Sequence, residues 1–379
     1  MDPLAHTLVG ATLAETGLKQ KTAWATVTMM IAANLPDIDG LCLIGGHDAG
    51  LAGRRGITHG VLAWVVLPLM LATLMHALAK RSARRKAAGP PRVKAQNTQE
   101  GPPVSFAWLL MLSAIGVWSH PLLDWMNSYG VRLLMPFSPT WFYGDALFII
   151  DPILWLFGGA AVVFAYGRTK VSAALWIVLL LVATAIVIVP SLTPPTSKMF
   201  WCLGAGLVVY LRIRGKPPSS LITARLCVFV LVMYIGTMLV GTANARTRAA
   251  AWLAQHNLAA SQIVVVPLAA RPFAREVIAR VGQTYHVLSV PVFGGGPPQA
   301  VAPPLPVGEK TPAVEAALAA PQAQGAVKWL RLAAYEEKAT SEGVLVTISD
   351  VRYSRIKNSR IGRTQVWLDH NLKVLAVQH

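Results

Sequence analysis

The chain has 379 residues, of which 54% are hydrophobic and only 13% are charged. A soluble domain carries roughly 25% charged residues, so this composition and the mean hydropathy of +0.50 exclude a wholly soluble protein and indicate membrane spans. The formal net charge of +17 is typical of nucleic-acid-binding proteins, but seven cations and no acids lie between Lys80 and Lys94, in a connector between two apolar runs, which favours a cytoplasmic loop and no nucleic-acid partner.

The first 35 residues do not fit a single membrane span. Residues 3–15 and 22–33 are mostly apolar, and a turn at Gly17–Lys21 carrying two lysines separates them. Each arm is only about 18–20 Å long as a helix. We therefore predict a short helical hairpin packed against full spans. Asp2 stands where a cleavable signal peptide would have basic residues, so the first apolar segment is expected to remain.

Six apolar runs follow that are long enough for membrane helices. They cover residues 57–79, 106–126, 146–166, 172–190, 199–213 and 221–241. Cations place the segments 80–103, 167–170 and 212–225 in the cytoplasm. The connections near 40–56, 127–145 and 191–198 then face outward. One alternation of spans satisfies all three cytoplasmic assignments.

After Val240 the chain is soluble in composition. Strand-like runs occur at 263–267, 284–290, 344–349 and 372–377, helices are expected near 245–256, 312–319 and 326–336, and 294–306 is a Gly/Pro-rich linker. We predict an all-α polytopic membrane helical bundle with an N-terminal short helical hairpin at 1–242, its catalytic part at about 1–165. A small C-terminal α+β soluble domain at 243–379 is predicted to lie outside the membrane on the extracytoplasmic side.

Several histidines and aspartates fall at helix ends that the predicted topology places on the outer side. They are His6, the turn Asn34-Leu-Pro-Asp37-Ile-Asp39, the segment Arg54-Arg55-Gly-Ile-Thr58-His59, the segment His120-Pro-Leu-Leu-Asp124, and then Asp145 and Asp151. Such residues are rare in membrane segments unless they face a cavity or a partner.

His120 and Asp124 are four residues apart, so they share one helix face and can reach one ion. Taken singly, a histidine is more often packed in a core, and an aspartate in a turn is more often a cap. Here, however, such residues occur in five places on the same side of one membrane, and this coincidence favours a divalent metal site over separate structural roles. We predict the ligands His6, Asp37, His59, His120 and Asp124. Imidazole with carboxylate suits zinc, or manganese where oxygen ligands dominate.

The same segments carry a family resemblance. His6-Thr-Leu-Val-Gly10, Asn34–Asp39, Arg55-Gly-Ile-Thr-His59-Gly60 and His120–Asp124 resemble the YdjM-type membrane-bound metal-dependent hydrolases over about residues 1–165, and Ser349–Tyr353 resembles a segment of longer members. The resemblance implies a bacterial inner-membrane protein with hydrolase activity and leaves the substrate open.

The order of the ligands is also similar to that of the zinc-dependent phospholipases C and related zinc nucleases. Those all-helical enzymes have a later HxxxE element, and no such motif follows Asp124 here. We therefore expect one or two ions rather than three.

The predicted chemistry is hydrolysis by metal-activated water. Asp39 or Asp145 is expected to accept the proton, and Arg55, or else Arg54, to hold a phosphate. The first substrate hypothesis is a phosphoester of a membrane lipid or a lipid-linked compound. His47 and Asp48 could join the site, and Asp151 is expected to cap a helix.

The rival functions are a transporter or scaffold that binds a cation without catalysis, and a sensor. Cys42, Cys202 and Cys227 are too far apart in the sequence to indicate a disulfide framework.

Overall fold

The structure is a computed structural model that describes residues 1–87, 102–166, 169–190, 193–214, 218–354 and 361–379. Parts of the predicted connections at 80–103, 167–170, 191–198 and 212–225 lie outside the described residues. The chain divides into two units. The first contains residues 1–38, 57–239 and 269–271, and the second contains residues 39–56, 240–268 and 272–379.

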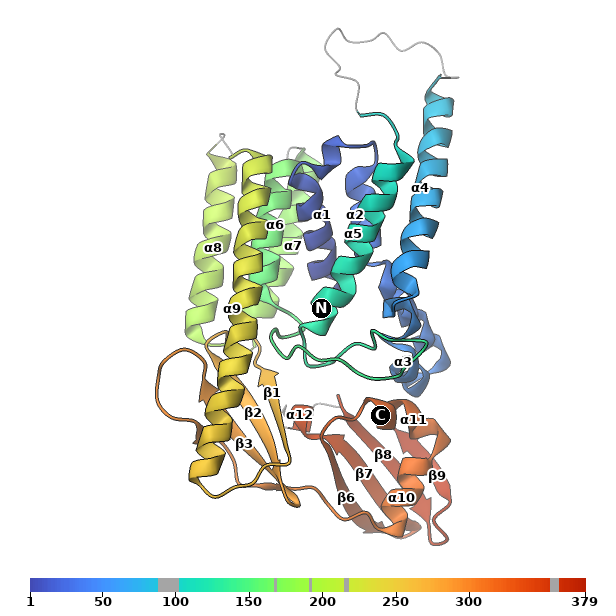
Figure 1. The fold of residues 1–379 in the computed structure, drawn as a ribbon, viewed down its shortest axis with the longest axis vertical. Helices are drawn as coiled ribbons and strands as arrows, with labels where there is room; N and C mark the ends of the chain where they lie inside the picture. Colours follow the sequence, from blue (N-terminus) through green and yellow to red (C-terminus); the bar gives the residue numbers. More distant parts are fainter. Residues whose placement is uncertain (88–101, 167–168, 191–192, 215–217, 355–360) are drawn as a thin grey trace. The chain divides into compact units, whose positions relative to one another are not determined.

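Helices make up the first unit (Figure 1). In chain order these are α1 (Pro3–Glu15), the 3-10 turn η1 (Leu18–Gln20), α2 (Ala25–Ala32), η2 (Leu35–Gly45), η3 (Ile57–His59), α4 (Ala63–Ala87), α5 (Phe106–Trp125), α6 (Pro152–Tyr166), α7 (Lys170–Ile188), α8 (Pro195–Ile213) and α9 (Ser220–Gln255). Two of them, η2 and α9, continue into the second unit. The helical membrane part and the β-containing C-terminal part that we predicted are both present.

Four described helices, α4, α5, α7 and α9, are long and apolar enough to cross a membrane. The pair α2 and η2 would add a fifth span if this pair, bent by 42°, forms one span. The predicted run 146–166 becomes a helix only from Pro152, because the carboxylate of Asp151 accepts the backbone N–H groups of Ile153 and Leu154 at 2.9 and 3.3 Å. This confirms that Asp151 caps a helix. The run 199–213 begins earlier than predicted, at Pro195.

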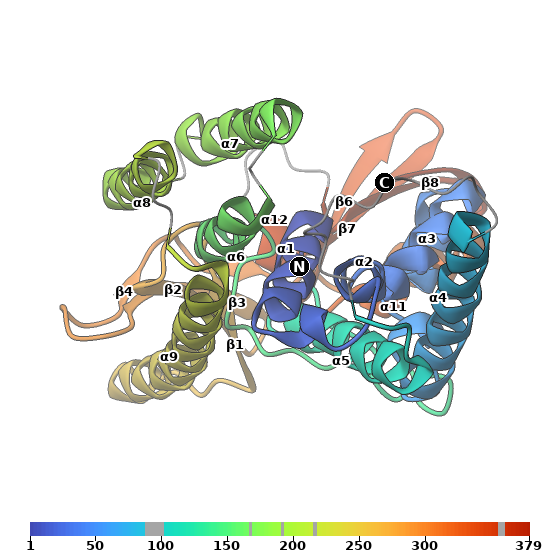
Figure 2. The same cartoon turned by 90° about the horizontal axis from the view of Figure 1, so that it is seen from above.

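Helix α1 lies at the centre of the first unit. Seen from above, it has α6 on one side and α2 and α5 on the other, and it contacts all three (Figure 2). Asn34, just after α2, donates a hydrogen bond to the hydroxyl of Thr7 on α1 at 2.9 Å. Gly116 of α5 faces the end of α2 so closely that a Cβ would overlap the side chain of Ala32. These contacts bring the ends of α1, α2 and α5 together.

The second unit contains two antiparallel sheets. The first has the order β1 (Gln262–Pro267), β2 (Ala274–Val281), β3 (Thr284–Pro291) and β4 (Gln299–Ala300), with β5 (Leu305–Pro306) also paired to β3; the second has the order β6 (Ala333–Thr340), β7 (Gly343–Asp350), β8 (Arg363–Asp369) and β9 (Val374–Gln378). The short helices are α3 (His47–Gly53), α10 (Pro312–Ala319), η4 (Pro321–Ala323), α11 (Gln324–Trp329) and α12 (Val351–Ser354). A shared core, which includes Tyr285 and Leu332, joins the two sheets.

Three features of the second unit differ from the sequence-based expectation. The predicted helix 326–336 ends at Trp329, and Ala333–Thr340 is a strand, because β6 pairs with β7 along its whole length and this pairing outweighs the helix propensity of Glu336, Glu337 and Lys338. The predicted linker 294–306 contains β4 and β5. The predicted helix 245–256 is the end of α9 rather than a separate helix.

The segment 39–56, here named the linking segment, folds with the second unit although it lies between two parts of the first. It contains α3, which packs against α11. Nothing in the composition of residues 39–56 had indicated this partnership.

We predict that Gly116→Val destabilises the first unit, because the added side chain must displace Ala32 or the backbone of α2. Overpacking of this kind costs about 1–3 kcal/mol. The matched control is Gly159→Val in α6, where an added Cβ meets nothing within 4 Å. Thermal unfolding in detergent should show a lower midpoint for Gly116→Val than for Gly159→Val, and equal midpoints would contradict the proposed close packing of α5 on α2.

Candidate metal centre

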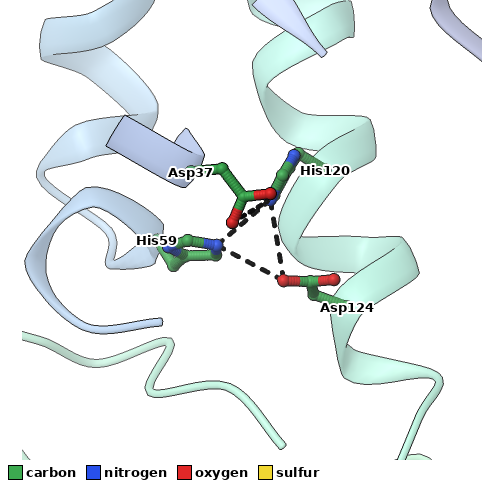
Figure 3. A group of neighbouring side chains, drawn as sticks. All are labelled: Asp37, His59, His120 and Asp124. Carbon is green, nitrogen blue, oxygen red and sulfur yellow. Dashed lines mark hydrogen bonds and ion pairs between the residues drawn. The ribbon is translucent and has the colours of Figure 1, made fainter. Parts of the chain in front are cut away.

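Four predicted ligands meet at one point of the first unit (Figure 3). Asp37 comes from η2, His59 from the end of η3, and His120 and Asp124 from α5. One ligand atom from each residue lies within 4.8 Å of those from the other three. The Asp124 carboxylate is 3.3 Å from Nε2 of His59 and 3.6 Å from Nε2 of His120, and Asp37 is 3.7 Å from the latter atom. This group can hold a metal ion.

The two imidazole rings present the same nitrogen to the centre. Nε2 of His59 and Nε2 of His120 are 3.1 Å apart. Nδ1 of His120 lies 2.6 Å from the backbone carbonyl of Ala33, and because a carbonyl oxygen only accepts, Nδ1 must carry the proton. In a neutral ring, Nε2 of His120 is then left with a lone pair. Nδ1 of His59 lies 3.1 Å from the hydroxyl of Thr58, which can accept in the same way.

An outer hydrogen bond to one ring nitrogen is the usual way in which proteins orient a metal-binding histidine. The His120 ring shows that arrangement, and the Thr58 hydroxyl allows the same arrangement for His59. The donor set of this group therefore fits a metal ion, and the fit rests on the direction of the nitrogen lone pairs as well as on proximity.

Burial and charge support the same interpretation. His59 and His120 are fully buried, and Asp124 is 1% exposed. With neutral imidazoles, the carboxylates of Asp37 and Asp124 give the group two negative charges. Burying charge without a partner is costly, and a divalent cation would balance these two charges.

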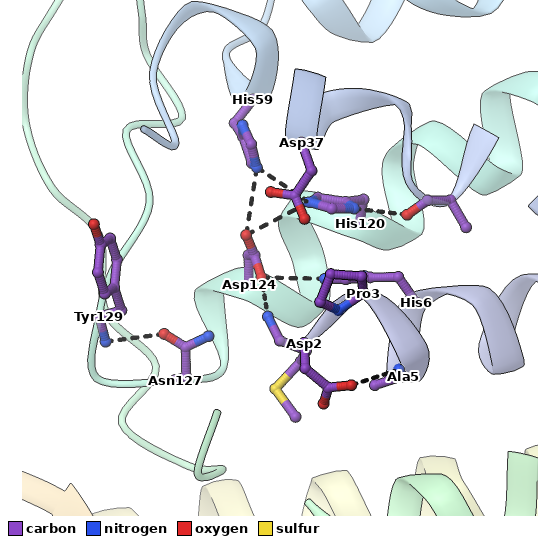
Figure 4. A network of polar contacts seen from close by, with 12 residues as sticks. Asp2, Pro3, Ala5, His6, Asp37, His59, His120, Asp124, Asn127 and Tyr129 are labelled. Carbon is purple, nitrogen blue, oxygen red and sulfur yellow. Dashed lines mark hydrogen bonds and ion pairs between the residues drawn. The ribbon is translucent and has the colours of Figure 1, made fainter. Parts of the chain in front are cut away.

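His6 lies beside the group rather than within it (Figure 4). Its ring stacks on that of His120 with centroids 3.7 Å apart, and its Nε2 is 3.3 Å from the Asp124 carboxylate. The terminal amino group of Met1 contacts the same carboxylate oxygen. His6 therefore contacts a residue of the group, and its role as a ligand stays a prediction.

The predicted catalytic residues lie in two places. Asp145 belongs to the first unit, in a loop held against the end of α5 by hydrogen bonds from Gly144 to the carbonyl of Trp125 and from Ala146 to that of Met126, at 2.6 and 2.7 Å. Asp39 and Arg55 belong to the linking segment, in which the backbone N–H of Arg55 donates to the Asp39 carboxylate at 2.7 Å. None of the three is in the ligand group found among the described residues.

Other residues that the sequence singled out have structural partners. Asp48 accepts backbone N–H groups of Gly325 and Ala326, and His47 stacks on His379. In the segment Ser349–Tyr353, Arg352 forms a buried ion pair with Asp350 at 2.7 Å.

A comparison with family models identifies the family of the chain. The model of the YdjM inner membrane protein matches residues 1–193, more than half of the chain. The chain belongs to the YdjM inner membrane protein family. All of the predicted site residues from His6 to Asp145 lie in the YdjM match. With its apolar helices, the chain is therefore a membrane protein. No curated protein and no solved structure matches it, and the likeness to zinc-dependent phospholipases C stays a prediction.

Two contacts of this candidate site could not be predicted from side-chain patterns. The carbonyl of Ala33 orients His120 but belongs to the backbone, so no residue type announces it. Thr58 precedes His59 directly, and a hydroxyl next to a candidate ligand was the available signal. Its role required the orientation of the imidazole ring.

We predict that Thr58→Val weakens metal binding about 10- to 100-fold, because the His59 ring loses the oxygen that orients it. Thr73→Val is the matched control, since the Thr73 hydroxyl only donates to the carbonyl of Leu69 on α4. A divalent-metal titration against a competing chelator measures both variants in detergent. Equal affinities for the two would show that Thr58 does not orient a ligand.

Proposed function

We propose that this protein is a metal-dependent hydrolase of the bacterial inner membrane that acts at the outer face on a phosphoester of a lipid or lipid-linked substrate. The single observation that carries the proposal is the pair of Nε2 atoms, His59 and His120, which face each other at 3.1 Å between two carboxylates. Buried nitrogen and oxygen ligands converging in this way are typical of catalytic metal sites in hydrolases.

Zinc is the favoured ion. Zinc bonds of about 2.0–2.2 Å at tetrahedral angles separate ligand atoms by about 3.3–3.5 Å. Four of the six separations among the ligand atoms of Asp37, His59, His120 and Asp124 lie close to that value, between 3.1 and 3.7 Å, and all six lie within 4.8 Å. Two imidazoles and two carboxylates also fit manganese, which remains the second choice. His6 is placed to serve a second ion or to hold Asp124, so we propose one or two ions.

When bound, the ion supplies Lewis acidity, which lowers the pKa of a water molecule and polarises an ester oxygen. The protein's own residues do the rest. A carboxylate that does not bind the ion accepts a proton, and Asp145 is favoured because its loop is held at the end of α5, which carries Asp124. Asp39 is the alternative. Arg55, or the more exposed Arg54, would hold the phosphate by paired hydrogen bonds.

A membrane lipid is the favoured substrate because the ligands lie at the ends of apolar helices. His120 and Asp124 occupy the last turns of α5, one of the helices able to span a membrane. A site in that position meets the headgroup region, where phosphoesters of lipids are found. A transporter would instead favour polar groups near the membrane midplane and internal repeats.

We predict that the purified protein hydrolyses a phosphodiester or phosphomonoester and that a chelator abolishes the activity. Asp124→Ala should lose both metal and activity, whereas Asp145→Asn should keep the metal and lower kcat by about 10²–10⁴-fold, as expected for the loss of a general base. His256→Gln, an exposed change in the second unit, is the control. Metal binding without hydrolysis of phosphate or carboxylic esters would favour the non-enzymatic alternative, a cation-binding transporter or scaffold.

The proposed topology places the linking segment and the C-terminal unit outside the cytoplasm. Cys42 is exposed in that segment, so a membrane-impermeant maleimide should label it in intact cells. Ala83→Cys near the end of α4, in a Cys42→Ser background, should react only after the membrane is permeabilised. Labelling of Ala83→Cys in intact cells together with protection of Cys42 would reverse the orientation.

A further inference from the structure

The ligand-bearing segments before α4 are joined by chain that folds elsewhere. Asp37 and His59 belong to the first unit, and the linking segment between them, residues 39–56, belongs to the second. The path of the chain between these two ligands is therefore set by how the linking segment is held. His120 and Asp124 differ, because the helix α5 sets their separation by itself.

The second unit holds the linking segment by specific polar contacts. The carboxylate of Asp48 accepts the backbone N–H groups of Gly325 and Ala326 at 2.7 and 3.1 Å. Gly325 is required at this place, because a Cβ there would collide with the backbone carbonyl of Asp48. The ring of His47 stacks on that of His379 with centroids 4.8 Å apart.

The stacked position of His47 suits an uncharged ring. Burial and the neighbouring His379 lower the pKa of His47, while Asp48 opposes the shift. At neutral pH the His47 ring is therefore uncharged. Helix α3 as a whole lies against α11.

The linking segment is also closed on itself near its two ends. The carboxylate of buried Asp39 accepts the backbone N–H of Arg55 at 2.7 Å and lies 3.7 Å from Nε of Arg54. Asp39 follows Asp37 by two residues, and Arg55 precedes His59 by four. The contact between Asp39 and Arg55 therefore brings together the two places where the chain continues to Asp37 and to His59.

We infer that the C-terminal unit is a positioning element for the metal centre: by holding the linking segment through Asp48, it pre-organises Asp37 and His59 for binding the ion. A free loop samples many separations of its ends. Ordering such a loop when the ion binds costs conformational entropy, and this cost weakens the affinity for the ion. Holding the loop in advance removes that cost, as pre-organisation does in other binding sites. The inference rests on the metal site of the proposed function and not on hydrolysis.

Three variants and one control test the inference in the full-length protein in detergent. Asp48→Ala removes the acceptor, Gly325→Ala disturbs the same contact from the other side, and Asp48→Asn keeps an acceptor oxygen. The control is Asp369→Ala, because the Asp369 carboxylate also accepts two backbone N–H groups, those of Asn371 and Lys373, but within the β8–β9 turn. Zinc affinity is measured by chelator competition, and the reaction rate of Cys42 with a maleimide reports release of the linking segment.

We expect Asp48→Ala and Gly325→Ala to bind zinc about tenfold more weakly and to react faster at Cys42, within the range seen when groups behind metal ligands are removed. Asp48→Asn should restore most of the affinity, and Asp369→Ala should stay within about twofold of the unmodified protein. Affinities of Asp48→Ala and Asp369→Ala that agree would overturn the positioning role. Failure of the unmodified protein to bind zinc would instead overturn the metal site itself.

Discussion

The burial of Asp124 among imidazoles is the constraint on which the first unit depends. This carboxylate is 1% exposed and contacts His6, His59 and His120, which come from three different elements. A charge removed from water needs partners, so the beginning of α1, the end of η3 and the end of α5 must lie at the same place. The close approach of Gly116 to α2 and the hydrogen bond from His120 to Ala33 hold α5 against α2 beside this centre. Packing in this part of the bundle serves the polar centre.

The four residues of the candidate metal centre could be predicted from the sequence because polar residues in apolar surroundings stand out. Asp37, His59, His120 and Asp124 each interrupt or end an apolar run, and the spacing of His120 and Asp124 directly implies a shared helix face. The spans α5, α7 and α9 were visible for the same reason. These signals are local, so they did not need knowledge of what each segment packs against.

Features that depend on distant partners were harder to predict. The strand β6 carries helix-favouring residues, and only its pairing with β7 makes it a strand. Strand β2 contains the charged residues Arg275, Glu276 and Arg280, so its composition did not indicate a strand. Its pairing with β1 and β3 accounts for the strand conformation. The allocation of residues 39–56 to the second unit rests on Asp48 meeting the start of α11, far along the chain. No sequence pattern in residues 39–56 or in α11 indicates that these two segments contact each other.

The centre has a rigid half and an adjustable half. One helix carries His120 and Asp124 four residues apart, so their spacing survives as long as α5 does. Asp37 and His59 sit in 3-10 turns on either side of the linking segment, and a 3-10 turn makes fewer stabilising contacts of its own than a long helix. Binding energies linked in this way are reciprocal. If the second unit raises the ion affinity by holding residues 39–56, then a bound ion must stabilise the held form of that segment by the same free energy.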